Sequence, residues 1–182
     1  MKIRKACVED ISAMLKIYTP YVENTSISFE YTAPTEAEFT KRFEEHVCMY
    51  PWLVYEVGGE IVGYAYAGRP FARMAYSWCA EISVYVSMES RGRGIGKALY
   101  AEVEKILKTQ GIEVVYAIIT GENEVSLRFH EALGYKHTAK YEKCGFKFGK
   151  WYDVYWLEKR LGNGGEPAKP PVSWNELTLD ID

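Results

Sequence analysis

A predicted strand, a glycine-rich turn and an amphipathic helix follow one another between Ser77 and Gln110. From Ser77 to Val86, two sets of side chains alternate with the two-residue period of a strand. From Gly94 to Gln110 the apolar residues fall at helical spacing, and Gly111 stands where a C-cap glycine belongs. The turn between them reads Arg91-Gly92-Arg93-Gly94-Ile95-Gly96. This order predicts a ligand site at the beginning of a helix.

The turn has the chemistry of a phosphate site. Its glycines let the backbone approach a ligand closely, and the helix behind it offers free N–H groups and the positive end of its dipole. Arg91 and Arg93 add charge that suits phosphate oxygens. The spacing of the glycines does not match the dinucleotide turn G-x-G-x-x-G, and the Walker A lysine is absent. The alternative is a plain glycine-rich turn with solvated arginines.

The remaining chain alternates predicted strands and helices. A helix is predicted from Asp10 to Val22, with Pro20 kinking or ending it. Thr35 begins a second helix in a capping box with Glu38, and Asn123 caps a short one reaching Leu133. Further strands are predicted at Met1 to Arg4, Trp52 to Val57, Ile61 to Ala67, Val114 to Ile119, Tyr135 to Lys143 and Trp151 to Leu157.

Length and composition favour one globular domain. The chain has 182 residues, 48% hydrophobic and 26% charged, which is enough apolar material for a single core. We predict a domain over residues 1–161. After it, glycines and three prolines form a linker, and an acidic C-terminal tail completes 162–182. The tail is either disordered or docked on this or another subunit.

The same composition excludes several classes of protein. The net charge is −3 with no basic stripe, so no nucleic-acid partner is expected. No apolar run of about 20 residues occurs and the amino terminus lacks a signal peptide, which predicts a cytoplasmic protein without a membrane partner. The four cysteines form no Cys-x-x-Cys pair, so we expect buried free thiols, without disulfides and without a metal site.

Glu81 is the candidate general base. It lies in the middle of a predicted strand among apolar residues, where a carboxylate is costly unless it is paired or used. Partial burial would raise its pKa toward the range that a base needs near neutral pH. The alternative is a structural glutamate paired with an arginine such as Arg73.

Several sequence blocks resemble one known family. Arg91-x-x-Gly94-x-Gly96 resembles the pyrophosphate-binding signature of the GNAT N-acetyltransferases. Within that family, four blocks resemble the phosphinothricin and methionine sulfone acetyltransferase group. They are Tyr64 to Gly68, Trp78 to Val86, His130 to Tyr135 and Gly145 to Trp151. The resemblance spans roughly residues 3–157. It implies an α/β (α+β) GNAT fold: a mixed, mostly antiparallel, splayed sheet of about seven strands flanked by about four helices.

The resemblance also implies a co-substrate and its binding residues. Acetyl-CoA would lie between the strand ending at Val86 and the strand near Val114 to Ile119. Backbone groups of Val84, Tyr85 and Val86 would pair with its pantetheine arm, and Asn123 would also contact it. The pyrophosphate would be held by Arg91, Gly92, Arg93, Gly94, Ile95 and Gly96.

Further roles follow from the resemblance. Glu81 matches the family's catalytic glutamate, and His130 stands where many members have a tyrosine that protonates the departing thiolate. His130 would be that acid or a helper to Glu81; the alternative is a histidine that only packs or caps. Arg73 would grip a substrate carboxylate, with Tyr76 and Phe29 lining the same pocket. A surface arginine and core aromatics are the alternatives.

The resulting function is direct transfer of an acetyl group from acetyl-CoA to the α-amine of a small amino-acid-like substrate. Phosphinothricin, methionine sulfone and methionine sulfoximine are the substrate types that the resemblance implies. A non-catalytic acyl-CoA sensor or interaction module and a protein N-terminal acetyltransferase are the alternatives. A homodimer is expected, with Lys143 to Trp151 contributing to its interface.

Overall fold

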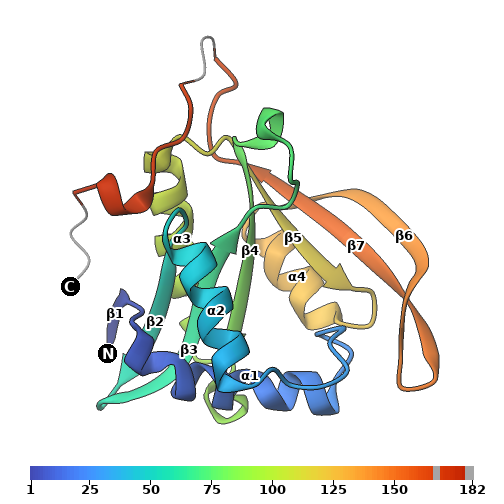
Figure 1. Cartoon of the computed structure of the whole chain (residues 1–182). Coiled ribbons are helices and arrows are strands. Elements are labelled where there is room, and N and C mark those ends of the chain that lie inside the picture. Colours follow the sequence, from blue (N-terminus) through green and yellow to red (C-terminus); the bar gives the residue numbers. More distant parts are fainter. Residues whose placement is uncertain (166–168, 179–182) are drawn as a thin grey trace.

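A seven-stranded sheet forms the centre of the protein (Figure 1). The structure is a computed structural model that describes residues 1–165 and 169–178. In chain order the strands are β1 (Lys2–Lys5), β2 (Trp52–Val57), β3 (Glu60–Gly68), β4 (Cys79–Val86), β5 (Val114–Thr120), β6 (Lys136–Lys147) and β7 (Lys150–Arg160). Across the sheet their order is β1-β2-β3-β4-β5-β7-β6, and only β4 and β5 pair in parallel. The expected mixed, mostly antiparallel sheet of about seven strands is confirmed.

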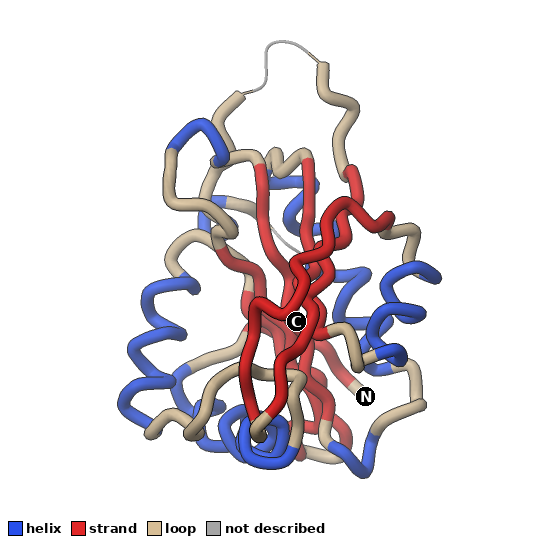
Figure 2. Tube along the Cα trace, turned by 90° about the vertical axis from the view of Figure 1, so that its right-hand side faces the viewer, coloured by secondary structure: helices blue, strands red, loops and turns tan. Residues whose placement is uncertain are grey.

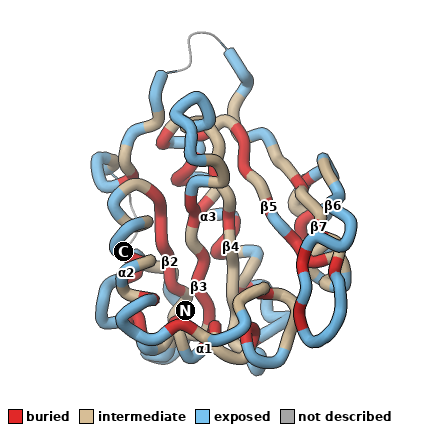
Figure 3. The backbone as a smooth tube through the Cα atoms, turned by 45° about the vertical axis from the view of Figure 1, so that its right-hand side comes forward, coloured by how far each residue is buried: buried red, intermediate tan, exposed pale blue. Residues whose placement is uncertain are grey.

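Helices cover both faces of this sheet (Figure 2). Within the described residues they are α1 (Ile11–Asn24), α2 (Glu36–Val47), α3 (Ile95–Gln110) and α4 (Glu124–Ala132). One core joins α1 and α2 to Trp52, Val54 and Tyr64, whereas Leu53 and Ala65 belong to the core that includes α3. Neighbouring residues of β2 and β3 thus point to opposite faces, as strand geometry requires. Figure 3 shows a continuous buried stretch in each of these strands.

Local sequence signals predicted most of the helix ends correctly. The predicted capping box is present: the Thr35 N–H donates to Glu38 Oε2 at 2.8 Å, and the Glu38 N–H donates to Thr35 Oγ1 at 3.3 Å. Pro20, however, does not end α1, which continues to Asn24. The carbonyl that Pro20 leaves without a donor belongs to Lys16, an exposed residue whose carbonyl can meet water. Packing of Tyr21 and Val22 then carries the helix onward.

The cysteines are free, but they are not buried as expected. Cys7, Cys48 and Cys144 are exposed, and Cys79 is half-buried. Cys7 and Cys48 stand at the ends of helical segments, and Cys144 lies where the β6–β7 pairing shifts its register. Sequence composition carries no information about such positions, which explains the error.

The described part of the C-terminal tail docks on the domain. Trp174 is only 1% exposed, and its Nε1 donates to the Val47 carbonyl at 2.7 Å. Gln110, at the end of α3, donates through Nε2 to the carbonyls of Met49 and Val172, each at 2.8 Å. Docking was one of the two expectations for 162–182. Residues 166–168 and the acidic end at 179–182 lie outside the described residues.

Candidate active site between strands β4 and β5

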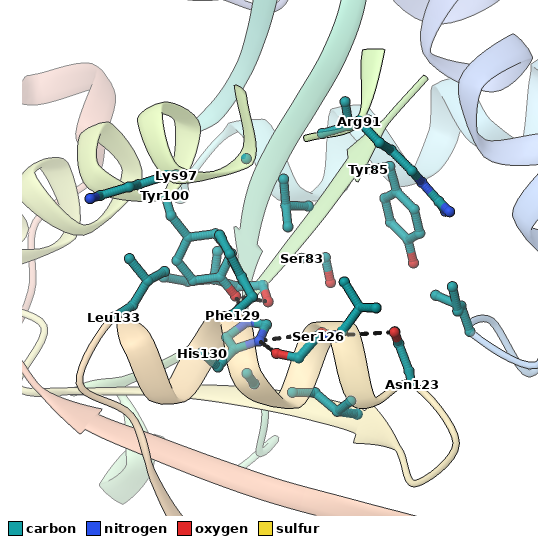
Figure 4. Close-up of a pocket in the computed structure, with 18 of the residues that line it drawn as sticks. Ser83, Tyr85, Arg91, Lys97, Tyr100, Asn123, Ser126, Phe129, His130 and Leu133 are labelled. Atoms are coloured by element: carbon teal, nitrogen blue, oxygen red, sulfur yellow. Dashed lines mark hydrogen bonds between the residues drawn. The ribbon is translucent and has the colours of Figure 1, made fainter. Parts of the chain in front are cut away.

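The sheet splits open between β4 and β5. These strands pair only at Cys79 with Val114, Ala80 with Val115 and Glu81 with Tyr116. Beyond these pairs the strands diverge, and a cleft of about 540 Å³ lies between them, lined from β4, β5, α3 and α4 (Figure 4). A gap in a sheet exposes backbone N–H and C=O groups that would otherwise pair with a neighbouring strand. The cleft therefore suits a long ligand that can replace a missing strand.

The backbone of β4 presents every second residue to this gap. The Ile82 carbonyl lies 3.0 Å from Tyr100 Oη, within hydrogen-bond distance. The Val86 N–H donates to Tyr21 Oη at 3.2 Å, and the Tyr21 hydroxyl donates to the Val86 carbonyl at 2.5 Å. Because polar groups alternate sides along an antiparallel strand, those of Val84 also point into the gap, whereas those of Tyr85 point toward β3.

The turn before α3 has the geometry that its glycines predict. Gly92 and Gly94 have φ angles of 76° and 79°, in the left-handed region that disfavours other residues. Ile95 then begins α3, whose first N–H groups lack helical acceptors. Arg91, Gly92, Gly94, Ile95 and Gly96 line the cleft, as does Asn123. Arg93 is exposed and does not line it.

Asn123 and His130 are both held by α4 (Figure 4). Asn123 caps the helix, accepting from the Ser126 N–H at 3.2 Å. His130 is buried, with Nδ1 2.7 Å from the Ser126 carbonyl and Nε2 2.7 Å from Tyr100 Oη. A carbonyl only accepts, so Nδ1 carries the proton and Nε2 accepts from Tyr100. Burial lowers the pKa of His130, which favours this neutral ring.

Tyr100 is a site residue that sequence reasoning missed. It is buried, lines the cleft and lies between the Ile82 carbonyl and His130. With one hydroxyl proton, it can donate to only one of these acceptors at a time. The signal in the sequence was a tyrosine beside Leu99 in the apolar stripe of α3, a position that usually means packing.

Glu81 stands at the point where β4 and β5 separate. Its side chain is on the opposite face of β4 from Ile82, which packs with the α3 core. Burial raises the pKa of Glu81 to about 7, and in the described part of the chain no charged partner opposes this. Arg73 is exposed, and no ion pair joins it to Glu81 within the described residues. The alternative of a structural Glu81–Arg73 pair is therefore not realised.

Aromatic side chains line the sheet next to Glu81. Tyr116 is the β5 partner of Glu81 in the last pair before the gap, and its ring centroid lies 5.9 Å from that of Phe71 and 5.7 Å from that of Trp156. The ring of Tyr76 packs on that of Phe71, with centroids 4.7 Å apart. The loop that carries Tyr76 and Arg73 therefore adds to this group of aromatic side chains. Of these aromatics only Tyr76 was predicted as a site residue. Phe71 comes from the same loop as Tyr76, whereas Tyr116 and Trp156 come from β5 and β7, which the sequence does not bring together.

Phe29 lies elsewhere than expected. It comes from the α1–α2 loop (residues 25–35) and packs against Tyr152 of the β6–β7 hairpin, with ring centroids 6.1 Å apart. Figure 1 places this loop and the loop of Arg73 and Tyr76 toward opposite ends of the sheet. Phe29 therefore does not share one wall with those two residues. The α1–α2 loop nevertheless reaches the cleft, because its Ile27 lines it.

In residues 1–165 and 169–178, no group of three or more His, Cys, Asp or Glu side chains is placed to hold a metal ion. Over the same residues, no helix has the length and apolar character needed to cross a membrane.

Comparison with known proteins identifies the family. The acetyltransferase (GNAT) domain matches residues 3–156. The chain belongs to the GNAT acetyltransferase family. The phosphinothricin N-acetyltransferase of Streptomyces viridochromogenes is 39% identical over 157 residues, which cover 86% of each chain. The L-methionine sulfoximine/L-methionine sulfone acetyltransferase of Pseudomonas aeruginosa is 34% identical over 166 residues, covering 87% of this chain and 94% of that protein.

A solved GNAT structure shares the fold closely. The phosphinothricin acetyltransferase of Sinorhizobium meliloti, in complex with acetyl-CoA, superimposes with a TM-score of 0.88 at 33% identity. The match covers 95% of this acetyltransferase and 97% of that chain. The resemblance that the sequence motifs indicated is confirmed at the level of family and fold.

Proposed function

We propose that this acetyltransferase moves the acetyl group of acetyl-CoA to the α-amine of a small amino-acid-like substrate of the phosphinothricin, methionine sulfone or methionine sulfoximine type. The substrate type follows the relatives that carry these names. The observation that carries the chemistry is Glu81, a carboxylate with its pKa raised to about 7 at the point where the cleft begins. A base with such a pKa is half ionised near neutral pH, which suits the deprotonation of an ammonium group.

The cofactor would occupy the gap between β4 and β5. Val84, whose backbone groups point into the gap, is the best placed of the three predicted pantetheine partners; the Tyr21 hydroxyl already bonds both polar groups of Val86. The pyrophosphate would lie on the N–H groups of Ile95 and Gly96. Arg91 supports this end of the cleft from 4.9 Å above the Tyr21 ring. The S. meliloti relative, which binds acetyl-CoA, supports the assignment.

The catalytic steps follow from this placement. Glu81 takes a proton from the ammonium group of the acceptor, directly or through water, and the free amine attacks the thioester carbonyl. The intermediate then holds an extra proton on its new C–N nitrogen. As it expels the CoA thiolate, this proton passes to the sulfur, directly or through water, and leaves the neutral amide and the CoA thiol. Neutral His130 offers only an acceptor at Nε2, and Tyr100 occupies it. We therefore assign His130 to orienting Tyr100 in the cleft rather than to protonating sulfur directly.

Acceptor binding would use the Glu81 face of the sheet. Phe71, Tyr76, Tyr116 and Trp156 provide an apolar wall beside the base. Arg73 is exposed on the loop that carries Tyr76, where its guanidinium is available to a substrate carboxylate. Small amino acids with a carboxylate and a compact side chain fit this combination.

Free-thiol release from acetyl-CoA tests the proposed function. The panel contains methionine sulfone, methionine sulfoximine, phosphinothricin, the common L-amino acids and short peptides. Acceptor-dependent release should be strongest with the sulfone, sulfoximine or phosphinate compounds. Thiol release with peptides alone would contradict the proposal and indicate protein acetylation. Tight acetyl-CoA binding without thiol release in the presence of any acceptor would indicate a non-catalytic acyl-CoA sensor.

We also propose that the protein is a homodimer whose interface includes the turn of the β6–β7 hairpin. Phe146, Phe148 and Trp151 are 43%, 58% and 57% exposed there, an unusual group of aromatic side chains on a surface. Sedimentation velocity should give a dimer, and Trp151→Glu should shift it toward monomer by placing a charge in the interface. Met74→Glu, at an 81% exposed site in another loop, is the control. Monomer alone at low and high concentration would refute the proposal.

A cytoplasmic location, without nucleic-acid or membrane partners and without a metal, remains a prediction from the sequence.

A further inference from the structure

Lys147 is a buried lysine with an unusual set of partners. It ends β6, is 1% exposed, and its ammonium donates three hydrogen bonds. The acceptors are the backbone carbonyls of Val22 at 2.5 Å, Thr25 at 2.9 Å and Ser28 at 2.7 Å. These belong to the end of α1 and the loop that follows, more than 100 residues away in the sequence. One side chain therefore fastens the α1–α2 loop to the β6–β7 hairpin.

The arrangement satisfies every donor of the buried ammonium group, although burial still lowers the pKa of Lys147. An ammonium has three N–H donors, and each has its own carbonyl here. The Val22 carbonyl is one of the last in α1, where the negative end of the helix dipole favours a cation. No carboxylate pairs with Lys147 among the described residues. An apolar side chain of similar volume would often stabilise the fold as well as a buried lysine does. Stability therefore does not explain why a lysine stands here, whereas positioning of the loop does.

Other contacts hold the same loop at defined points. Thr120, at the end of β5, donates through Oγ1 to the Ser26 carbonyl at 2.7 Å. The hydroxyls of Ser28 and Tyr18 are 2.7 Å apart. Phe29 packs so closely on Gly145 of β6 that an added Cβ there would lie 2.3 Å from its ring. Between these anchors, Ile27 lines the cleft.

We propose that Lys147 is a positioning residue for acceptor binding: it holds the α1–α2 loop, with Ile27 and Phe29, as the wall of the active site opposite the loop of Arg73 and Tyr76. This proposal rests on the proposed function, because it assigns the loop to the acceptor of the acetyl transfer. The two loops lie toward opposite ends of the sheet (Figure 1), and Glu81 lies in β4 at the last position that pairs with β5. Loosening one wall leaves the β4 backbone and the phosphate turn intact.

Steady-state kinetics of Lys147→Met test the proposal. Methionine keeps most of the length but has no donor or charge, so the loop loses three hydrogen bonds at once. We expect the KM for the acceptor to rise by about tenfold or more, while the Kd for acetyl-CoA changes by less than about threefold. Lys136→Met, at an exposed position at the other end of β6, is the matched control and should change neither constant. An unchanged acceptor KM in a folded Lys147→Met variant would overturn the proposal.

A second variant and a second measurement keep the test decisive. Gly145→Ala retains Lys147 but forces Phe29 away from the hairpin, so it should raise the acceptor KM in the same selective way even where Lys147→Met fails to fold. Amide hydrogen exchange of the free protein should show faster exchange in residues 25–29 of either variant than in Lys136→Met. Hydrogen exchange needs no acceptor. If the wild-type protein were inactive, the proposed function would be refuted, but the exchange rates would still test whether Lys147 holds the α1–α2 loop. Unchanged exchange in both variants would refute that role of Lys147.

Discussion

Glu81→Gln is expected to lower kcat by about 10²- to 10³-fold, within the range that a general base contributes to catalysis. Glutamine has almost the same shape and packs in the same place on β4, but it cannot accept the proton of the ammonium group. The Kd for acetyl-CoA should change by less than about twofold, because the backbone of Val84 and the phosphate turn are untouched. Thiol release at saturating substrates measures the first effect, and calorimetric titration measures the second.

Glu158→Gln provides the matched control for this variant. Glu158 lies in β7 opposite Tyr116, on the same face of the sheet as Glu81, and it has no place in the proposed mechanism. Its turnover should equal that of the wild type. Unchanged turnover in Glu81→Gln, or an equal loss in both variants, would remove Glu81 from the mechanism.

The thermal stability of Glu81→Gln shows whether a loss of activity comes from the missing base or from unfolding of the protein. Burial raises the pKa of Glu81 from its ordinary 4.5 to about 7, so the folded state binds this proton more tightly than the unfolded state. Ionisation therefore costs stability as the pH rises from about 4.5 to about 7, and the full cost remains above that range. Glu81→Gln should accordingly unfold at a temperature no lower than the wild type at pH 8.

Gly94→Val is expected to raise the Kd for acetyl-CoA by about tenfold or more. Gly94 has a φ of 79°, where a side chain costs about 1–2 kcal/mol and a β-branched one is especially strained. A Cβ at Gly94 meets no protein atom within 4 Å, so the new side chain occupies only the space before α3 where the phosphates would lie. Calorimetric titration with acetyl-CoA measures the loss.

Gly58→Val is the control for backbone strain. Gly58, in the β2–β3 turn, also has a left-handed φ of 60° and no atom within 4 Å of an added Cβ. It should lower thermal stability to a similar extent and leave the Kd for acetyl-CoA unchanged. Normal binding by Gly94→Val would contradict the assignment of Arg91 to Gly96 to the pyrophosphate.

Features set by local sequence were predicted well. The alternation in Ser77 to Val86, the left-handed glycines before α3 and the capping box at Thr35 each depend on a few neighbouring residues. The position of Glu81 on the face of β4 opposite Ile82 followed from the same alternation, and no charged group in the described part of the chain pairs with it.

Features that join distant segments were not predictable in the same way. Tyr100 meets His130 only because α3 and α4 pack against the same core beside the cleft. Tyr116 and Trp156 become neighbours only through the pairing of β5 with β7. Lys147 looks like an ordinary strand lysine until the α1–α2 loop folds over it. In each case the chain carries the residue, but the partner is fixed by the tertiary fold.

In helix α1, Pro20 illustrates how tertiary packing overrides a local rule. A proline inside a helix removes one hydrogen bond and usually ends or bends the helix. Here Ile17, Tyr18, Tyr21 and Val22 are buried on both sides of Pro20, and this contact with the sheet keeps the last turn of α1 in place. The continued helix then brings the Tyr21 hydroxyl to Val86 and the Val22 carbonyl to Lys147.

The pH dependence of kcat/KM for the acceptor, at saturating acetyl-CoA, tests the role of Glu81 most directly. For the wild type, the activity should fall below an apparent pKa of about 7, because Glu81 must be ionised to accept the proton. In Glu81→Gln the residual activity should lack this acidic limb. A wild-type profile without an ionisation between about pH 6 and 8, or an acidic limb retained in Glu81→Gln, would contradict the account.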